Sequence, residues 1–468
     1  MISSLYYIAV LLGTAIFCIS TVLLLQKPFF KLAVSATKQL DVLFNSDLGE
    51  SEKDRLILRN LSQLLKYLFL SLFGMMGTVA LGIVPVLIYS AQFPDEAIDT
   101  SSLWFYLCMV AGSFVLFFFK KKSDYSYWSK LLHYLILDHY QLGRYLYKRE
   151  ISKYLREETV VDKPFVLVTG LARAGTTALT NLLYDPSFFH SIRYSNVPFL
   201  MAPRSWKKLY HPKNNETKER AHGDAVAVGE QSVEALEEYF FKVFLNDEFI
   251  QDHHLEKHEL SPTLLSHYLK YQELFREQND TLYLAKNNNL LLRFESFTAL
   301  KANIRAVFIF RNPIDHAQSL LRQHQNFCDQ QTEDPFVLQY MNWMGHHEFG
   351  QNHKAIKLNK EHFCSERDPS TIDYWLCLWV DYHQYFLQID DKTKVILVHY
   401  DDLLKSPDAL KRSISNQLDI SFHESALEPF NPRRNKDKPE VVVDSKLKLS
   451  ALEIYEQLVS DKLTIDNT

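Results

Sequence analysis

A short glycine-bounded loop follows a strongly apolar segment at residues 165–169, which read Phe-Val-Leu-Val-Thr. That pattern is typical of a buried parallel strand, and residues 178–183 have the pattern of a helix. The backbone N–H groups at the start of such a helix point at an anion, and the helix dipole favours negative charge there. The loop therefore predicts a phosphate-binding site, with the candidate residues Gly170, Arg173, Ala174, Gly175, Thr176 and Thr177.

The spacing from Gly170 to Gly175 is that of a nucleoside-triphosphatase loop, but Thr176 stands where that loop has its lysine. That lysine and the magnesium ion beside it act on a γ-phosphate. Hydrolysis of a triphosphate is therefore disfavoured. Arg173 is the fixed cation inside the loop.

A second candidate phosphate site follows another apolar segment, residues 306–310. Arg311 comes directly after it, and Ser319 lies eight residues further on, in the first turns of a predicted helix. Arginine offers a rigid fork of donors to a phosphate, and a hydroxyl near a helix N-terminus adds another.

Two further strand-like segments end in polar residues. Residues 281–285 lead into Lys286, and residues 394–398 lead to His399 and Tyr400. Lys286 could meet developing negative charge, or be an ordinary lysine at the end of a strand. Tyr400 could pack its ring on a base, or simply anchor its strand.

These four segments, in this order, resemble those of the sulfotransferase family that uses 3′-phosphoadenosine 5′-phosphosulfate as donor. The resemblance covers Pro164 to about Leu427, and Ala172 and Ala174 depart from the family's loop at its proline and serine. It implies an α/β fold, in which a P-loop-type parallel sheet is flanked by helices. The roles that it implies are the 5′-phosphosulfate for the loop with Arg173, the 3′-phosphate for Arg311 and Ser319, the transferring group for Lys286 and the adenine for Tyr400.

The general base is the weakest part of the match. Soluble members have a histidine two residues after the lysine, and this chain has Asn288. Some bacterial members resemble the stretch around residues 222–240, although Val233 replaces their proline, and several branches use a glutamate as base. The candidates are Glu238 or Glu237, with His222 behind them; each could instead be a solvated surface residue. If this stretch is helical, Glu234 shares a face with Glu238.

No metal site is predicted. The adjacent pairs His253–His254 and His346–His347 lack ligand spacing around them. The resemblance implies sulfuryl transfer without a metal.

Three uncharged runs, at about 5–25, 67–89 and 103–119, predict transmembrane helices, although the shorter third run could also be a buried or re-entrant helix. The segment between the first two is rich in Lys and Arg, and the segment between the second and third has acidic residues but neither Lys nor Arg. Three lysines, Lys120 to Lys122, follow the third run. The positive-inside rule then places the N-terminus outside and the body in the cytoplasm.

Composition agrees with this placement. The net charge of −5 argues against a general nucleic-acid partner. The five scattered cysteines include no Cys-x-x-Cys pair and are predicted to be free thiols in a reducing compartment.

The predicted organisation is a membrane region (1–124), an amphipathic helical linker (125–160), a sulfotransferase domain (161–430), and a basic loop with a final helix (431–468). The linker helix could lie on the membrane or begin the soluble domain. The basic loop could close over the 3′-phosphate, be solvated, or contact anionic lipid.

The predicted function is a membrane-anchored sulfotransferase. The predicted acceptor group is a hydroxyl or an amine, and location alone suggests a lipid, a lipid-linked glycan or a polymer being built at the inner leaflet as its carrier. The alternatives are a P-loop nucleotide kinase-like enzyme, or a non-catalytic membrane scaffold with a nucleotide-binding fold.

Overall fold

The chain is described here by a computed structural model. It covers residues 2–45, 48–94, 102–115, 127–155, 163–211, 218–219, 227–228, 232–276, 281–359, 364, 367–420 and 441–465. Two compact units are present, Met1–Leu142 and Gly143–Thr468. The second is built on a parallel sheet with helices around it, so the predicted α/β fold class is confirmed.

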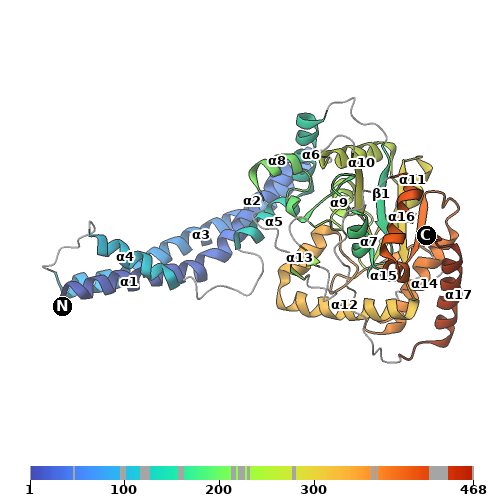
Figure 1. The fold of residues 1–468 in the computed structure, drawn as a ribbon. Helices are drawn as coiled ribbons and strands as arrows, with labels where there is room; N and C mark the ends of the chain where they lie inside the picture. Colours follow the sequence, from blue (N-terminus) through green and yellow to red (C-terminus); the bar gives the residue numbers. More distant parts are fainter. Residues whose placement is uncertain are drawn as a thin grey trace. The chain divides into compact units, whose positions relative to one another are not determined.

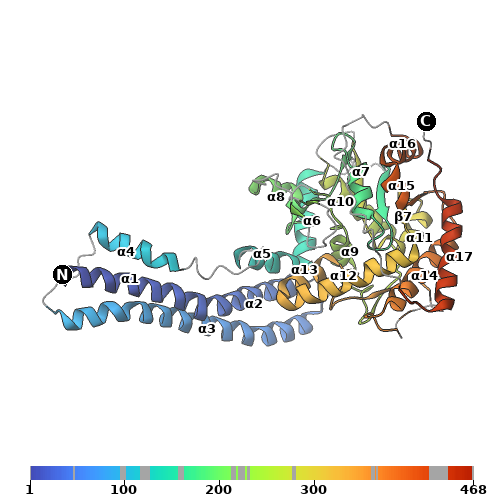
Figure 2. The ribbon, with the colours of Figure 1, turned by 60° about the horizontal axis from the view of Figure 1, so that its bottom comes forward.

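The first unit is a helical hairpin (Figures 1 and 2). Its first arm is α1 (Ile2–Ser20), the π-helical segment η1 (Thr21–Leu25) and α2 (Gln26–Phe44), which follow one another without a break. The second arm is α3 (Glu50–Gln92), which runs back beside the first. The arms approach closely at two glycines: a Cβ on Gly13 would lie 2.5 Å from the carbonyl oxygen of Gly82. Small residues permit such contact between membrane helices.

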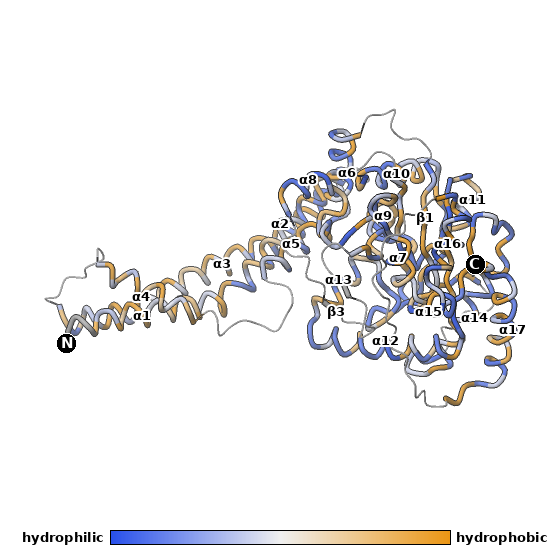
Figure 3. Tube along the Cα trace, viewed as in Figure 1, coloured by the Kyte–Doolittle hydropathy of each residue, from blue (hydrophilic) through white to orange (hydrophobic). Residues whose placement is uncertain are grey.

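Both arms are long and apolar enough to cross a membrane, by length and composition. Figure 3 shows hydrophobic residues along α1, along α4 (Leu103–Ser113) and in the neighbouring part of α3. Large apolar side chains such as Phe73, Met76 and Leu87 are exposed there. The third predicted span begins as α4, and its residues 116–119 lie outside the described residues.

The predicted linker contains two helices, α5 (Tyr127–Leu137) and α6 (Tyr140–Tyr154). Tyr147 of α6 is buried, and its ring contacts those of Phe240 and Phe244 within the second unit. From Gly143 onward, α6 is therefore a helix of the folded body, which favours the second of the two interpretations of this segment.

The central sheet of the second unit has the strand order β2-β6-β1-β7-β9, and every pairing is parallel. The four predicted strands are present, each within one or two residues of its predicted bounds. They are β1 (Phe165–Thr169), β6 (Leu282–Lys286), β7 (Ile304–Phe310) and β9 (Val395–His399), and the fifth strand is β2 (Phe189–His190).

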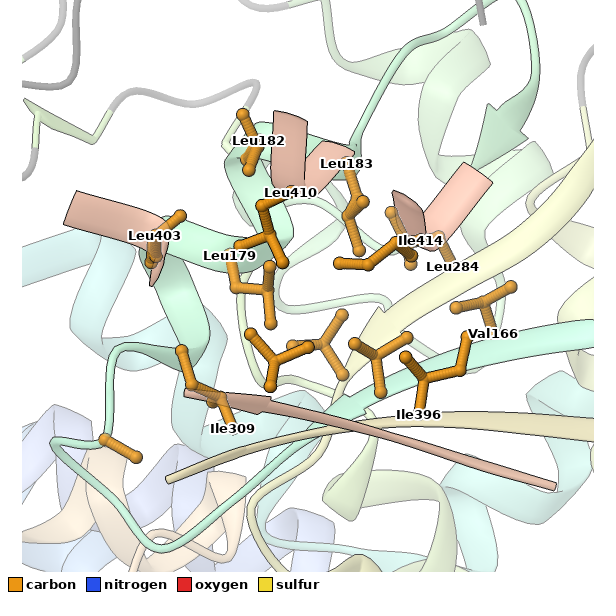
Figure 4. Close-up of a cluster of buried hydrophobic side chains, with 14 of the residues drawn as sticks. Val166, Leu179, Leu182, Leu183, Leu284, Ile309, Ile396, Leu403, Leu410 and Ile414 are labelled. Carbon is orange, nitrogen blue, oxygen red and sulfur yellow. The ribbon is translucent and has the colours of Figure 1, made fainter. Parts of the chain in front are cut away.

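A hydrophobic core lies between one face of this sheet and three helices, α7 (Thr176–Leu183), α15 (Tyr400–Lys405) and α16 (Pro407–Leu418). Figure 4 shows Leu179 and Leu183 of α7 above the strands. On the other face, the Phe308 ring stacks on Phe386 of α14 (Ile372–Gln388) at 4.0 Å. Because neighbouring side chains of β7 point to opposite faces of the sheet, this strand contributes to the packing on both faces.

The remaining elements surround this core. They are η4 (Tyr194–Asn196), α8 (Pro203–Leu209), β3 (Lys218–Glu219), β4 (Ala227–Val228), α9 (Glu238–Leu245), β5 (His254–Glu256), α10 (Pro262–Leu274), η5 (Leu290–Leu292), α11 (Phe294–Ala299), α12 (Pro313–Glu333), α13 (Pro335–Met344), β8 (Ala355–Lys357) and α17 (Ser445–Asp461). The predicted final helix is α17. The predicted basic loop lies outside the described residues.

One prediction about the cysteines is wrong. Cys364 and Cys377 form a disulfide, whereas Cys18, Cys108 and Cys328 are free. The spacing of thirteen residues carried no recognisable pattern, because one partner follows β8 and the other lies within α14. Cys364 and Cys377 therefore give no support for a reducing compartment.

Candidate functional site

The glycine-bounded loop connects β1 to α7 at the carboxyl edge of the sheet. Its two glycines are required by their surroundings, because both have positive φ, 149° at Gly170 and 108° at Gly175. A Cβ on Gly170 would lie 2.4 Å from the Ile309 carbonyl oxygen, and one on Gly175 would lie 2.6 Å from the Tyr400 ring. The backbone thus passes close to β7 and to the first residue of α15, and α7 begins with its N–H groups at the sheet edge.

The two predicted anion sites are adjacent. Arg311 donates from Nη1 to the carbonyl oxygen of Arg173 over 3.3 Å, and Arg173 donates from Nε to Ser319 Oγ over 3.3 Å. Arg173 itself has a left-handed backbone, with φ of 71°. This strained backbone conformation directs the guanidinium of Arg173 toward the end of β7 and toward α12.

Arg311 is built to meet a further acceptor. Its guanidinium lies over the Tyr400 ring, 4.7 Å from the centroid, and its Nε is buried without a hydrogen-bond partner among the described residues. Burial lowers the pKa of Arg311, yet a guanidinium stays charged at neutral pH. A buried donor on a charged group with no acceptor is costly, and a bound phosphate would satisfy it.

A buried histidine supports the loop from behind. His316 Nε2 lies 2.8 Å from the Ala172 carbonyl oxygen, so this nitrogen carries the hydrogen. Burial holds the pKa of His316 well below its usual value, which keeps the ring neutral beside two arginines.

Lys286 lies at the end of β6, directly beside the loop. Its Nζ donates to Thr177 Oγ1 and to Glu234 Oε2, each at 2.7 Å, and all three side chains are buried. The loop, a fixed ammonium and a carboxylate therefore meet at one point of the sheet edge. Glu234 is not on the predicted helix, because α9 begins at Glu238.

Glu237 and Glu238 are engaged elsewhere. Glu237 accepts hydrogen bonds from Tyr268, Tyr283 and Asn287, and its burial raises its pKa against the effect of those bonds. Glu238 is held on both oxygens by Arg293, at 2.9 and 2.5 Å, and this pair is buried.

Both carboxylates are thus buried and hydrogen-bonded to neighbouring side chains, and a role for either as the general base stays a prediction. Their hydrogen bonds hold the start of α9, because Glu237 is its N-cap and Glu238 its first residue. His222, the third candidate, lies outside the described residues.

Sequence reasoning missed three residues at this edge. Arg293 and Glu348 belong to no recognised pattern, and Glu234 was considered only as a neighbour on a helix face. Asn288, at the position of the soluble members' histidine, donates from Nδ2 to Glu348 Oε1 over 3.3 Å. Where the chain departs from the family, at Asn288, its side chain therefore contacts the carboxylate of Glu348 from a distant part of the sequence. Residue spacing alone does not reveal this contact.

Comparison with known proteins identifies the fold. The model of the sulfotransferase family matches residues 164–424, more than half of the chain. No match was found among curated proteins.

The chain is also similar to solved structures that are described as sulfotransferases. Sulfotransferase STF1 from Mycobacterium tuberculosis is 15% identical, with coverage of 63% of this chain and 77% of that one and a TM-score of 0.36. The sulfotransferase domain from the curacin biosynthetic pathway is 15% identical, with coverage of 64% and 99% and a TM-score of 0.32. STF9 from Mycobacterium avium is 11% identical, with coverage of 74% and 86% and a TM-score of 0.34.

Proposed function

Because the chain belongs to the sulfotransferase family, we propose that it transfers a sulfuryl group from 3′-phosphoadenosine 5′-phosphosulfate to an acceptor at a membrane. In this proposal the loop from Gly170 to Thr177 binds the 5′-phosphosulfate, and Arg311 with Ser319 binds the 3′-phosphate. Tyr400 lies beside the adenine.

One observation supports the choice of donor above the others. The two candidate anion-binding sites come from separate parts of the sequence and are in contact, since Arg311 Nη1 donates to the Arg173 carbonyl oxygen. In addition, Arg311 Nε is buried without a hydrogen-bond partner among the described residues. A nucleotide with phosphate at both the 3′ and 5′ positions matches two such sites, whereas a triphosphate needs only one. Thr176 in place of the P-loop lysine agrees with this preference.

The same geometry suggests how the reaction proceeds. An acceptor oxygen or nitrogen attacks sulfur, the bond from sulfur to the bridging oxygen breaks, and 3′-phosphoadenosine 5′-phosphate leaves. Lys286 and Arg173 stabilise the charge that builds on the bridging oxygen. Glu234 is buried and hydrogen-bonded like Glu237 and Glu238, but its partner Lys286 also contacts Thr177 of the loop, and for this reason we propose that the acceptor's proton passes to Glu234. No step in this scheme uses a metal.

Donor preference tests the proposal directly. The full-length protein in nanodiscs is heated with 3′-phosphoadenosine 5′-phosphate, or with ATP plus magnesium. We expect the bisphosphate to raise the Tm and ATP to have little effect. A larger shift with ATP would favour the kinase-like alternative, and no shift with either would favour a non-catalytic scaffold.

We also propose three membrane crossings with the body in the cytoplasm. The described flanks of the third run support a third crossing. Tyr7 of α1 bonds Ser102 at 3.0 Å, whereas the Tyr127 hydroxyl donates to the Gln26 carbonyl over 2.8 Å. From Tyr7 to Gln26 a helix rises about 28 Å, close to the thickness of a hydrocarbon core.

The orientation rests on loop charge, and one finding stands against it. The segment between the first two runs carries seven basic residues: Lys27, Lys31, Lys38, Lys53, Arg55, Arg59 and Lys66. The disulfide between Cys364 and Cys377 is instead typical of an oxidising compartment.

A further inference from the structure

Two sulfur atoms and a carboxylate lie together at helix α14. Cys377 and Asp381 are four residues apart on this helix, so their side chains share one of its faces. Cys364, from the chain before α14, joins them, and its Cα lies 6.0 Å from that of Cys377. The two sulfurs and a carboxylate oxygen of Asp381 all lie within 4.8 Å of one another. The catalytic scheme above uses none of these three side chains.

The carboxylate of this cluster is buried with no cation beside it. Asp381 is 6% exposed, and its Oδ2 lies 3.2 Å from Cys364 Sγ. Over the part of the chain that the structure describes, no Lys, Arg or His forms an ion pair with this carboxylate. Burying a carboxylate away from positive charge is costly, because the ion loses its hydration without compensation. A metal cation bound beside the two sulfurs would supply the missing charge.

A disulfide and a metal site are alternative states of this pair of cysteines. The proposed cytoplasmic orientation exposes the pair to a reducing environment, where disulfides are rare and neighbouring cysteines more often bind metal or act in catalysis. A thiol reductant there supplies two electrons and two protons, the bond between the sulfurs breaks, and each sulfur becomes a thiol. Metal binding then releases those two protons, because the thiolate is the ligand.

The types of ligand favour zinc. Thiolates suit Zn²⁺, whereas Mg²⁺ and Ca²⁺ prefer oxygen ligands alone. Around a tetrahedral Zn²⁺ the ligand atoms are about 3.6–3.8 Å apart, so Cys364 Sγ and Asp381 Oδ2 need to move little. The two sulfurs separate once their bond is broken. Cys377 is half-buried, so an ion can reach the cluster from solvent and keep a water molecule as its fourth ligand.

We propose that the reduced protein binds one Zn²⁺ ion through Cys364, Cys377 and Asp381. The ion is structural: it fastens Cys364 to α14, the helix whose Phe386 stacks on Phe308 of the central sheet. Oxidation of the two cysteines to the disulfide removes both thiolate ligands and releases the ion. The site is independent of the donor and the acceptor of sulfuryl transfer.

Zinc binding to the two redox states tests the inference. The full-length protein in nanodiscs is freed of metal and prepared either reduced by a phosphine or with the disulfide intact. Zn²⁺ is titrated in competition with a chromophoric chelator. We expect the reduced form to bind one more equivalent than the oxidised form, at least about 100-fold more tightly than any site that the two forms share. Equal binding by the two forms overturns the proposal.

The oxidised form is a close control. Cys18, Cys108 and Cys328 are free in the structure, so their thiols are present in both forms, as are all the histidines. A difference between the forms therefore reports the pair at α14 alone. Titration with Co²⁺ identifies the ligands: the reduced form should show thiolate-to-metal charge-transfer absorption and the intense visible bands of tetrahedral cobalt. A cobalt spectrum without these features contradicts the proposed ligand set.

Variants assign the site to individual residues. Asp381→Asn should weaken Zn²⁺ binding to the reduced form at least about tenfold, because an amide carries no charge, and Cys364→Ser should abolish the additional equivalent. Cys328→Ser is the matched control and should keep wild-type affinity, since Cys328 lies outside the cluster. If Cys364→Ser does not fold, Asp381→Asn and the comparison of redox states decide the matter. Wild-type affinity in folded Asp381→Asn overturns the proposal.

The thermal shift with 3′-phosphoadenosine 5′-phosphate separates this inference from the proposed function. If that shift is absent while the reduced form binds its additional zinc, the proposed function fails and the metal site stands. If the shift is present and no additional zinc binds, only the metal site fails.

Discussion

Arg311 is the residue on which donor binding should depend most strongly. Its guanidinium is oriented by Tyr400 and by the Arg173 carbonyl, and its Nε lacks a partner. Arg311→Lys keeps the charge but loses the rigid fork of donors. We expect affinity for 3′-phosphoadenosine 5′-phosphate to fall at least about tenfold by calorimetry, since a hydrogen bond to a charged group contributes about 1.5–3 kcal/mol.

Arg322→Lys is the control for this change, because Arg322 is exposed on α12, the helix that begins two residues after Arg311. Equal affinities in the two variants would remove Arg311 from the donor site.

Substitutions at Glu234 and Glu238 should differ in their effect on the chemical step of the reaction. Glu234→Gln keeps the shape of the side chain but cannot accept the acceptor's proton, so kcat per folded molecule should fall about 10²–10⁴-fold. This variant also leaves Lys286 buried without its carboxylate, so its free energy of unfolding should fall as well. Glu238→Gln should lower the free energy of unfolding by about 3 kcal/mol or more, because it leaves Arg293 buried without its partner.

Rates per folded molecule and denaturant unfolding, measured on both variants, distinguish these outcomes. Near-normal kcat in Glu234→Gln would exclude it as the base.

At the scale of elements, the sequence predicted what local pattern controls. Apolar runs placed the strands now seen as β1, β6, β7 and β9, and the resemblance placed Arg173, Arg311 and Lys286 at their ends. Contacts that depend on tertiary packing were not predictable. The position of Glu234 depends on where α9 begins, which is four residues further along the chain. Glu348 accepts a hydrogen bond from Asn288, which lies sixty residues earlier in the sequence.

Helix α14 carries a carboxyl group whose ionisation opposes folding. Burial raises the pKa of Asp381 from 3.8 to about 7, and its Oδ2 lies 3.2 Å from Cys364 Sγ. Between pH 4 and 7 the folded protein therefore holds a proton that the unfolded chain has lost, so this group lowers stability as pH rises through that range and by a constant amount above it.

Asp381→Asn removes this dependence. By urea unfolding of the oxidised protein, we expect the variant's advantage over wild type to grow by about 2–4 kcal/mol between pH 4 and pH 8, with allowance for solvent screening. An advantage that does not change with pH would mean that Asp381 ionises as freely in the folded protein as in the unfolded chain.

For the whole molecule, the state of one disulfide reports the side of the membrane. If the body faces the cytoplasm, Cys364 and Cys377 should be reduced in cells and should pair only after lysis. Acid quenching followed by a maleimide that adds mass counts these thiols in place, and Cys328 serves as the internal control because it is free in the structure. A pair already oxidised in cells would place the body in an oxidising compartment and reverse the proposed orientation.

The length of the hairpin also restricts which bilayers suit the protein. Helix α3 has 43 residues, about 64 Å at the helical rise, whereas a hydrocarbon core is about 30 Å thick. The apolar run within it, residues 67–89, alone measures about 34 Å. If α3 spans a bilayer as proposed, that excess over the core is absorbed by helix tilt or by local thickening of the lipid, at a cost that grows in thinner membranes. Hydrophobic mismatch would therefore sort this protein toward the thicker membranes of its cell.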